Sequence, residues 1–213
     1  MKIGILWDLD GTLLDTLQDL ADSCNHVLTE LGHPTRSREE VRRFVGNGIR
    51  RLMEQAVPEG VPAEPAYEMI KSYYASHCQI KTAAYPGINA ALESLRAYPM
   101  AIVSNKPDGA VKTLCSDFFP GIYTRGESAD CPRKPAPDMV HKAMEDLGID
   151  GCIYVGDSEV DIATAKNAGV PCLSVTWGFR SRDALIAAGA TRFCDDPGDL
   201  KEVLEEMMKS YGK

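Results

Sequence analysis

A short apolar segment followed by an acidic loop sets the architecture of this chain: residues 3–7 are IGILW and residues 8–13 are DLDGTL. A continuous apolar run of this length is typical of a strand buried on both faces of a parallel sheet. The loop places Asp8 and Asp10 at the carboxyl end of that strand, where open α/β sheets gather their active sites. Two carboxylates there repel each other and indicate a bound cation or a shared proton. An Asp-Gly turn that leads into a helix is the structural alternative.

Similar apolar runs recur along the rest of the chain, separated by segments with helical periodicity. Further strands are predicted at residues 100–103, 152–155 and 170–176, with a weaker one at 192–194. The predicted helices between them cover residues 86–97, 107–117, 137–147, 158–168, 182–188 and 198–210. Strands that alternate with helices favour an α/β fold with a parallel sheet and right-handed crossovers.

Residues 15–84 interrupt this alternation, with helical patterns and no convincing strand. A helix with one apolar face is predicted from Leu17 to Leu31 and stops at Gly32. Ser37 and Glu40 have the spacing of a capping box, which predicts that another helix begins there. We therefore expect an all-helical domain over residues 15–84, inserted into an α/β core formed by residues 1–14 and 85–213.

Composition limits the classes of partner. The chain has 213 residues, with 31 Asp and Glu against 23 Lys and Arg, for a formal net charge of −8. Without a basic block it is unsuited to nucleic acid or anionic membranes, and no apolar stretch approaches the roughly 20 residues of a membrane span. We expect no secretory leader, because Met1 and Lys2 are not followed by an apolar stretch that ends at a small-residue cleavage site. The seven cysteines contain no C-x-x-C pair. We expect reduced thiols and a cytoplasmic protein, monomeric or homodimeric.

Three more motifs follow predicted strands or precede predicted helices. Residues 104–106 (SNK) come after the strand at 100–103, and residues 156–158 (GDS) come after the strand at 152–155, with Asp161 shortly beyond. Lys134 lies just before the helix at 137–147, next to a proline that restricts the backbone. Taken singly, the serines are explained as helix caps and Lys134 as a solvated lysine.

Taken together and in this order, the motifs resemble the haloacid dehalogenase (HAD) superfamily of phosphohydrolases. The resemblance extends from Asp8 to Asp161, and the helical insert is similar to the family's cap domain, which covers the active site. Residues 8–16 (DLDGTLLDT), 45–52 (VGNGIRRL) and 176–190 (TWGFRSRDALIAAGA) resemble the phosphoglycolate phosphatase branch. The fold implied is a Rossmann-like parallel-sheet core with an all-helical cap.

The resemblance also implies catalytic roles for four residues. Asp8 would be the nucleophile that becomes an aspartyl phosphate, and Asp10 would protonate the leaving alcohol and then deprotonate water. Ser104 would hold the phosphoryl oxygens, and Lys134 would neutralise charge on Asp8 and on the phosphate. The implied phosphate-binding set is Leu9, Asp10, Ser104, Asn105 and Lys134.

A magnesium site belongs to the same resemblance. Mg²⁺ would be bound by the Asp8 carboxylate, the Asp10 backbone carbonyl and Asp157, with Asp161 orienting these groups. Charge supports the metal, because the four carboxylates and Lys134 together carry −3, which Mg²⁺ reduces to −1. At a separation of 4 Å, each unit pair of like charges costs about 4 kcal/mol at an effective dielectric of roughly 20. We therefore expect activity to depend on a divalent metal.

Substrate choice is expected to depend on the helical insert. Gly46, Asn47 and Gly48 allow the backbone to approach a ligand closely, and Arg50 or Arg51 could bind a carboxylate with both arms of the guanidinium. Solvated arginines on a helix face are the alternative explanation. The expected partner is a small phosphorylated metabolite such as phosphoglycolate.

Several other functions use similar residues. A β-phosphoglucomutase-like phosphomutase would use Asp8 and Asp10 and return the phosphoryl group to a sugar, and a pyrophosphatase or nucleotide hydrolase would differ only in substrate. A dehalogenase does not need Asp10, and a phosphonatase requires a cap lysine, for which Lys71 and Lys81 are poor candidates. A receiver-like signalling module would also phosphorylate a strand-end Asp, but the D-x-D spacing and the helical insert argue against it.

Overall fold

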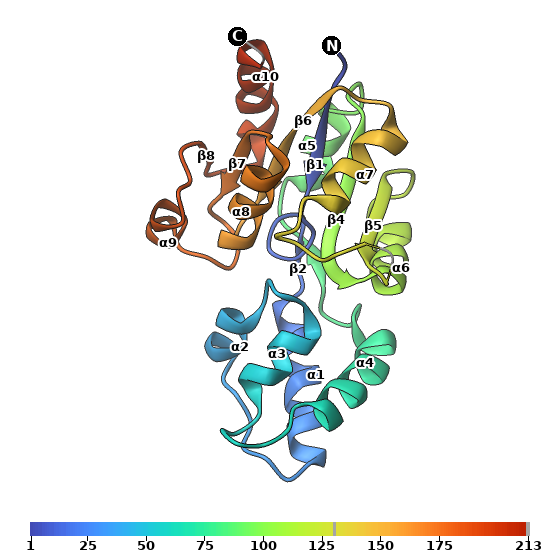
Figure 1. Ribbon diagram of the computed structural model, residues 1–213, viewed down its shortest axis with the longest axis vertical. Coiled ribbons are helices and arrows are strands. Elements are labelled where there is room, and N and C mark those ends of the chain that lie inside the picture. Colours follow the sequence, from blue (N-terminus) through green and yellow to red (C-terminus); the bar gives the residue numbers. More distant parts are fainter. Residues whose placement is uncertain (130, 212–213) are drawn as a thin grey trace. The chain divides into compact units, whose positions relative to one another are not determined.

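The structure is a computed structural model that describes residues 1–129 and 131–211, and it divides into two compact units (Figure 1). The α/β unit comprises Met1–Leu14 and the chain from Ala84 onward, and the helical unit comprises Asp15–Ala83. The chain therefore passes between the units twice. That the helical unit acts as a cap stays a prediction.

A parallel sheet of six strands lies at the centre of the α/β unit, in the order β5-β4-β1-β6-β7-β8. The strands are β1 (Ile3–Trp7), β4 (Met100–Pro107), β5 (Tyr123–Glu127), β6 (Gly151–Gly156), β7 (Cys172–Val175) and β8 (Phe193–Cys194). Along β6 every residue is buried, and along β1 only the first is not, as expected for strands covered on both faces. The predicted α/β fold class is confirmed.

Helices cover both faces of this sheet. Right-handed crossovers place α5 and α6 on one face and α7 and α8 on the other, and Figure 1 shows α7 and α8 in front of the sheet with α5 behind it. Successive strands are added on one side of β1 and then on the other, which creates a switch point at its carboxyl end. The helices of this unit are α5 (Ile88–Ser94), α6 (Asp108–Phe118), α7 (Asp138–Leu147), α8 (Glu159–Ala168), α9 (Arg182–Ala187), the 3₁₀ helix η1 (Pro197–Asp199) and α10 (Leu200–Ser210).

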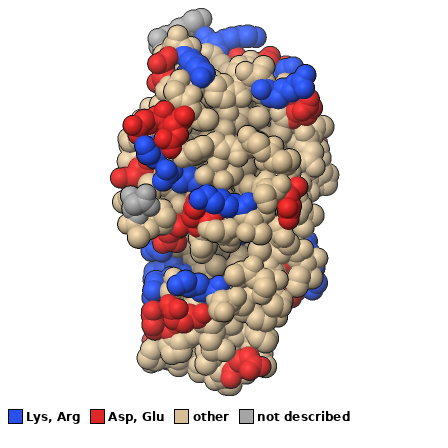
Figure 2. Space-filling view, turned by 90° about the vertical axis from the view of Figure 1, so that its right-hand side faces the viewer, with Lys and Arg blue, Asp and Glu red and all other residues tan. Residues whose placement is uncertain are grey.

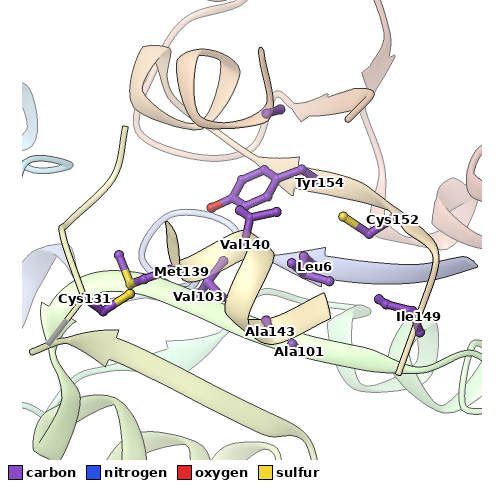
Figure 3. Packing of buried hydrophobic residues seen from close by; sticks show 11 residues of the cluster. Leu6, Ala101, Val103, Cys131, Met139, Val140, Ala143, Ile149, Cys152 and Tyr154 are labelled. Atoms are coloured by element: carbon purple, nitrogen blue, oxygen red, sulfur yellow. The ribbon is translucent and has the colours of Figure 1, made fainter. Parts of the chain in front are cut away.

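One apolar cluster joins α7 to the sheet (Figure 3). Met139, Val140 and Ala143 on α7 are fully buried against residues of β1, β4 and β6. The apolar residues of α7 recur at three- and four-residue spacing, so they share one helix face. The sheet contributes Leu6, Ala101, Val103, Cys152 and Tyr154 to this cluster. All seven cysteines are free thiols, as expected, and six of them are buried.

Two strand assignments differ from the sequence-based expectation. Strand β5 was not predicted, because its sequence YTRGE is polar and most of its residues are only partly buried at the edge of the sheet. The expectation of no strand between β1 and Pro86 is wrong as well, because β2 (Leu14–Asp15) pairs with β3 (Ala83–Ala84). Two-residue strands leave no periodicity to detect.

The helical unit contains α1 (Leu17–Glu30), α2 (Arg38–Phe44), α3 (Gly48–Ala56) and α4 (Glu64–His77). The capping box predicted at the start of α2 is confirmed, since the Glu40 backbone N–H donates to Ser37 Oγ and the Ser37 backbone N–H donates to the Glu40 carboxylate. The apolar face of α1 is buried, including Leu20, Cys24 and Val27. Helix α4 has Pro65 in its first turn, where proline is well tolerated.

Surface charges of both signs lie close together. On the face shown in Figure 2, basic and acidic side chains form small adjoining groups instead of one extended basic area. Many are helix neighbours three or four residues apart, such as Arg51 with Glu54 at 2.7 Å. Exposed pairs of this kind add little stability. Among residues 1–129 and 131–211, no helix is both long and apolar enough to cross a membrane.

Candidate active site

The carboxyl ends of β1 and β6 bring predicted site residues together. Asp8 directly follows β1 and Asp157 directly follows β6, and the two strands are paired so that Trp7 lies opposite Val155. Carboxylate oxygens of Asp8, Asp157 and Asp161 lie within 4.8 Å of one another, and all three residues are buried. The carboxyl ends of these two parallel strands therefore lie at one edge of the sheet.

Lys134 carries the positive charge nearest to these carboxylates. Its Nζ donates to Asp8 Oδ1 at 2.7 Å, to Asp161 Oδ1 at 2.9 Å and to Tyr154 Oη at 2.9 Å. The residue is 2% exposed, so it is not the solvated lysine of the alternative explanation. Burial alone would lower the pKa of Lys134, but the carboxylates of Asp161 and Asp8 raise it well above its usual value. Lys134 is therefore a permanent cation beside Asp8.

Asp161 is held by its own helix and by the site at once. Its Oδ2 accepts from the backbone N–H and the Oγ of Ser158 at the start of α8, and its Oδ1 accepts from Lys134 and from the Tyr154 hydroxyl. Helix capping and a role in the site, two explanations considered for this motif, are thus compatible. With four donors on its two oxygens, Asp161 is suited to orient Lys134.

The Asp157 carboxylate is enclosed by two loops. Its Oδ2 accepts from the Phe179 backbone N–H at 2.6 Å, and its Oδ1 accepts from Thr12 Oγ1 at 3.3 Å. Gly11 has a φ of +87°, and a Cβ there would lie 2.3 Å from Asp157 Oδ2. A Cβ on Gly178 would lie 2.4 Å from the same side chain. Both glycines are needed because the backbone approaches the carboxylate too closely for any side chain.

The donor set fits a magnesium ion. Burial and the neighbouring Asp161 raise the pKa of Asp8 to about 7, although Lys134 lowers it. Burial, Asp161 and Asp8 raise the pKa of Asp157 well above its usual range. Burial and the closeness of like charges both make these carboxylates costly to keep ionised without a further cation. Oxygen ligands and this charge are what Mg²⁺ prefers, so Asp8 and Asp157 could hold the ion.

A second buried lysine was missed in the sequence. Lys106 is 3% exposed, and its Nζ lies 3.2 Å from Asp10 Oδ1. Lys106 changes the charge balance, because the four carboxylates with Lys134, Lys106 and Mg²⁺ sum to zero instead of −1. Its position inside the motif SNK was visible, but a lysine at the end of a strand gives no sign by itself of being buried.

The end of β4 also supplies Ser104 and Asn105, both buried. Ser104 Oγ accepts from the Lys106 backbone N–H. The Asn105 side chain makes a reciprocal pair with Lys134, donating to its carbonyl at 2.9 Å and accepting from its backbone N–H at 2.7 Å. The side-chain amide of Asn105 is therefore occupied in holding the backbone of Lys134. The predicted contact between Asn105 and phosphate stays a prediction, and it would be made by the Asn105 backbone N–H. The Leu9 side chain is fully buried, so the phosphate contact predicted for Leu9 would also be made by its backbone.

The residues predicted to bind substrate from the helical unit lie around the start of α3. Gly46 and Gly48 have positive φ angles of 119° and 80°, and Asn47 precedes the helix. The Arg50 guanidinium already contacts both carboxylate oxygens of Glu64 and stacks on Tyr67 at 3.8 Å from the ring centroid. A substrate carboxylate would have to compete with Glu64 for Arg50.

Two other groups at the site escaped sequence reasoning. Tyr154 has an apolar ring in an apolar strand, and nothing in its sequence position shows where its hydroxyl points. The loop at 176–180 was noted only as part of a resemblance, yet its Trp177 Nε1 donates to the Thr12 carbonyl at 3.0 Å and its Phe179 N–H holds Asp157. Gly178, between the aromatic residues of this loop, was the one feature of the sequence that could have indicated a close backbone approach.

Comparisons with known proteins agree with this architecture. Residues 5–175 match the family described as haloacid dehalogenase-like hydrolase. Two curated relatives are both phosphoglycolate phosphatases. That of Rhodobacter capsulatus is 35% identical over 208 residues, covering 92% of this chain and 94% of the relative. That of Pseudomonas putida is 33% identical over 207 residues, covering 90% of this chain and 76% of the relative.

A solved structure of a Lactobacillus delbrueckii subsp. bulgaricus protein, provisionally assigned as a phosphoglycolate phosphatase, is also similar. It has a TM-score of 0.89 and 35% identity and covers 94% of this chain and 97% of the solved one. The family match spans most of the α/β unit and all of the helical unit. With the D-x-D loop after β1 and the buried Asp8, Lys134 and Asp157 at one sheet edge, these matches show that the chain belongs to the haloacid dehalogenase-like hydrolase family.

Proposed function

We propose that this protein is a Mg²⁺-dependent phosphatase that hydrolyses a small phosphate monoester, phosphoglycolate or a close analogue, through an aspartyl phosphate on Asp8. The class, phosphoric monoester hydrolase, is that of its relatives in Rhodobacter capsulatus and Pseudomonas putida. The observation that carries the proposal is the pairing of Asp8 with Lys134 at 2.7 Å beside Asp157, at the switch point of the sheet.

In the first half-reaction an Asp8 carboxylate oxygen attacks phosphorus, and the bond from phosphorus to the ester oxygen breaks. Asp10 gives its proton to that oxygen, so the alcohol leaves neutral. Lys134 holds Asp8 in place and neutralises charge on the phosphoryl oxygens. The Ser104 hydroxyl and backbone N–H groups at the end of β4 hold the same oxygens. The product of this step is the mixed anhydride on Asp8.

In the second half-reaction water attacks the phosphorus of the aspartyl phosphate. Asp10, now a carboxylate, takes a proton from this water, and the bond between phosphorus and the Asp8 oxygen breaks. Inorganic phosphate and the Asp8 carboxylate result, and Asp10 is again protonated for the next turnover. Lys106 lies 3.2 Å from Asp10, which keeps the carboxylate directed and balances its charge between the two steps.

Mg²⁺ would be held by the Asp8 carboxylate, the Asp10 backbone carbonyl and Asp157, with Asp161 orienting Lys134 beside them. When bound, Mg²⁺ would neutralise negative charge on the transferring phosphoryl group. Thr12 and the Phe179 N–H fix the Asp157 carboxylate, so this group is ordered by the protein itself. Gly46, Asn47, Gly48 and Arg50 in the helical unit are the proposed substrate-binding residues.

A metal-dependent screen for phosphate release tests the proposal. The purified chain is assayed with and without Mg²⁺ on phosphoglycolate, sugar phosphates, nucleotides and pyrophosphate, and sugar phosphates are also analysed for isomerised product. We expect phosphate release from phosphoglycolate, full loss in excess chelator and recovery when Mg²⁺ is restored.

The other outcomes separate the alternatives. Isomeric sugar phosphate without net phosphate release would indicate a phosphomutase, and release from pyrophosphate alone would indicate a pyrophosphatase. One phosphate bound per chain without turnover would indicate a receiver-like module. Turnover that survives excess chelator would show that the metal proposal is wrong.

A further inference from the structure

Tyr154 connects the apolar core of the α/β unit to the buried charges of the site. It lies on β6, is fully buried and belongs to the cluster under α7. Figure 3 shows its ring beside Val140, with the hydroxyl oxygen directed away from Cys152. That oxygen lies 2.9 Å from Lys134 Nζ and 3.2 Å from Asp161 Oδ1. One end of the side chain is therefore held by packing, and the other reaches the site.

The Tyr154 hydroxyl is the third hydrogen-bond acceptor of the Lys134 ammonium. A lysine ammonium has three N–H donors, and three acceptors are within reach: Asp8 Oδ1, Asp161 Oδ1 and Tyr154 Oη. The Tyr154 hydroxyl in turn donates a hydrogen bond to Asp161 Oδ1. Three acceptors in fixed directions leave the ammonium a single orientation, whereas two carboxylates alone would let it rotate or move between them.

Packing alone does not account for the hydroxyl. The cluster around the ring is apolar, and phenylalanine would fill the same space without the cost of burying a polar group. The contacts described for the hydroxyl are those with Lys134 and Asp161. The location of the Tyr154 hydroxyl is therefore best explained by its hydrogen bond with Lys134.

We propose that Tyr154 is a positioning residue, whose rigidly packed hydroxyl sets where the Lys134 ammonium lies and thereby how Lys134 holds Asp8. The effect on catalysis rests on the proposed phosphatase function, but the contact between the two residues does not. Removing the hydroxyl would leave one buried N–H of Lys134 without its acceptor, which is costly. The ammonium would then be free to rotate and to move between Asp8 and Asp161, and it would hold Asp8 in a less fixed position.

The test compares Tyr154→Phe, which keeps the ring, with Thr164→Val as the matched control. Thr164 is also a buried hydroxyl residue of this unit, but it donates to the Val160 carbonyl within α8. Each variant is assayed for kcat and KM on p-nitrophenyl phosphate at saturating Mg²⁺. The ¹⁵N signal of the Lys134 ammonium is recorded in parallel and is assigned by its disappearance in Lys134→Arg.

We expect Tyr154→Phe to lower kcat about ten- to a hundredfold, the usual effect of losing a partner of a site group, with KM changed less than about threefold. The Lys134 signal should shift and exchange faster with water, and Thr164→Val should change neither quantity. An unchanged kcat, an unchanged Lys134 signal or an equal loss in Thr164→Val would each overturn the proposal. If the wild type releases no phosphate, the proposed function fails, and the signal alone decides whether Tyr154 holds Lys134.

Discussion

Each unit of the molecule buries a carboxylate, and the two are held in opposite ways. Asp19 in the helical unit is 2% exposed and accepts from the backbone N–H groups of Lys81 and Thr82 and from Thr82 Oγ1, at 2.8 to 3.0 Å. Asp8 in the α/β unit faces Asp157 and Asp161 and has Lys134 as its cation. Asp19 accepts from neutral N–H and O–H donors, whereas Asp8 lies beside two other carboxylates and one lysine.

This difference separates a structural carboxylate from a chemical one. A buried carboxylate that accepts several hydrogen bonds from neighbouring backbone groups ties segments of the chain together. A buried carboxylate beside like charges is stabilised by a nearby cation, such as a lysine or a metal ion. Burial alone therefore does not identify a functional residue, and the partners of the carboxylate do.

The largest effect should come from Asp8→Asn. The amide is not a nucleophile, so turnover should fall by more than about a thousandfold while the chain still folds. Asp19→Asn is the matched control, because it makes the same chemical change at the other buried carboxylate. Phosphate release and circular dichroism on both variants check the comparison. Retained turnover in Asp8→Asn would show that the aspartyl-phosphate mechanism is wrong.

Lys106→Met should have the next largest effect. Without its ion pair Asp10 is less well directed, and the site gains net negative charge. We expect kcat/KM to fall about ten- to a hundredfold, part of what general acid–base catalysis contributes. Lys112→Met is the control, since Lys112 on α6 pairs with Asp108 in an exposed position. Equal kcat/KM values in the two variants would show that Lys106 does not contribute to catalysis through Asp10.

Asp19→Ala should lower stability and not catalysis. It leaves buried donors at Lys81 and Thr82 without an acceptor, so the free energy of unfolding should fall by about 3 kcal/mol. Asp22→Ala on the same helix removes an exposed ion pair to Lys81 and should cost little. Urea unfolding followed by far-UV circular dichroism measures both. A loss in Asp22→Ala as large as in Asp19→Ala would contradict the comparison.

Arg50→Ala should have the smallest effect. Because Glu64 and Tyr67 already contact the guanidinium, a substrate carboxylate gains little from it, and the KM for phosphoglycolate should rise about fivefold or less. The KM for p-nitrophenyl phosphate, which has no carboxylate, should not change. Arg51→Ala, which removes the other arginine considered for this contact, is measured in parallel. Equal KM changes for the two substrates would argue against a carboxylate contact at Arg50.

Much of the fold was predictable because its signals are local. Strands β1 and β6 are continuous apolar runs, and the capping box of α2 has its partners three residues apart. Strand β5 was not predictable, because a polar edge strand is specified by its neighbour β4 and not by its own pattern. The same division applies to the candidate site. Asp8 and Asp157 were found from their places at strand ends.

The amino-acid sequence by itself determined which residues follow which strand. Because parallel strands end at the same edge of a sheet, it also determined that Asp8 and Asp157 would lie close together. Only the tertiary structure decided which side chains meet across long stretches of chain, such as Lys106 with Asp10 and Tyr154 with Lys134. The physical reason is that backbone pattern sets where a residue lies, whereas packing of the surrounding elements sets where a long side chain ends.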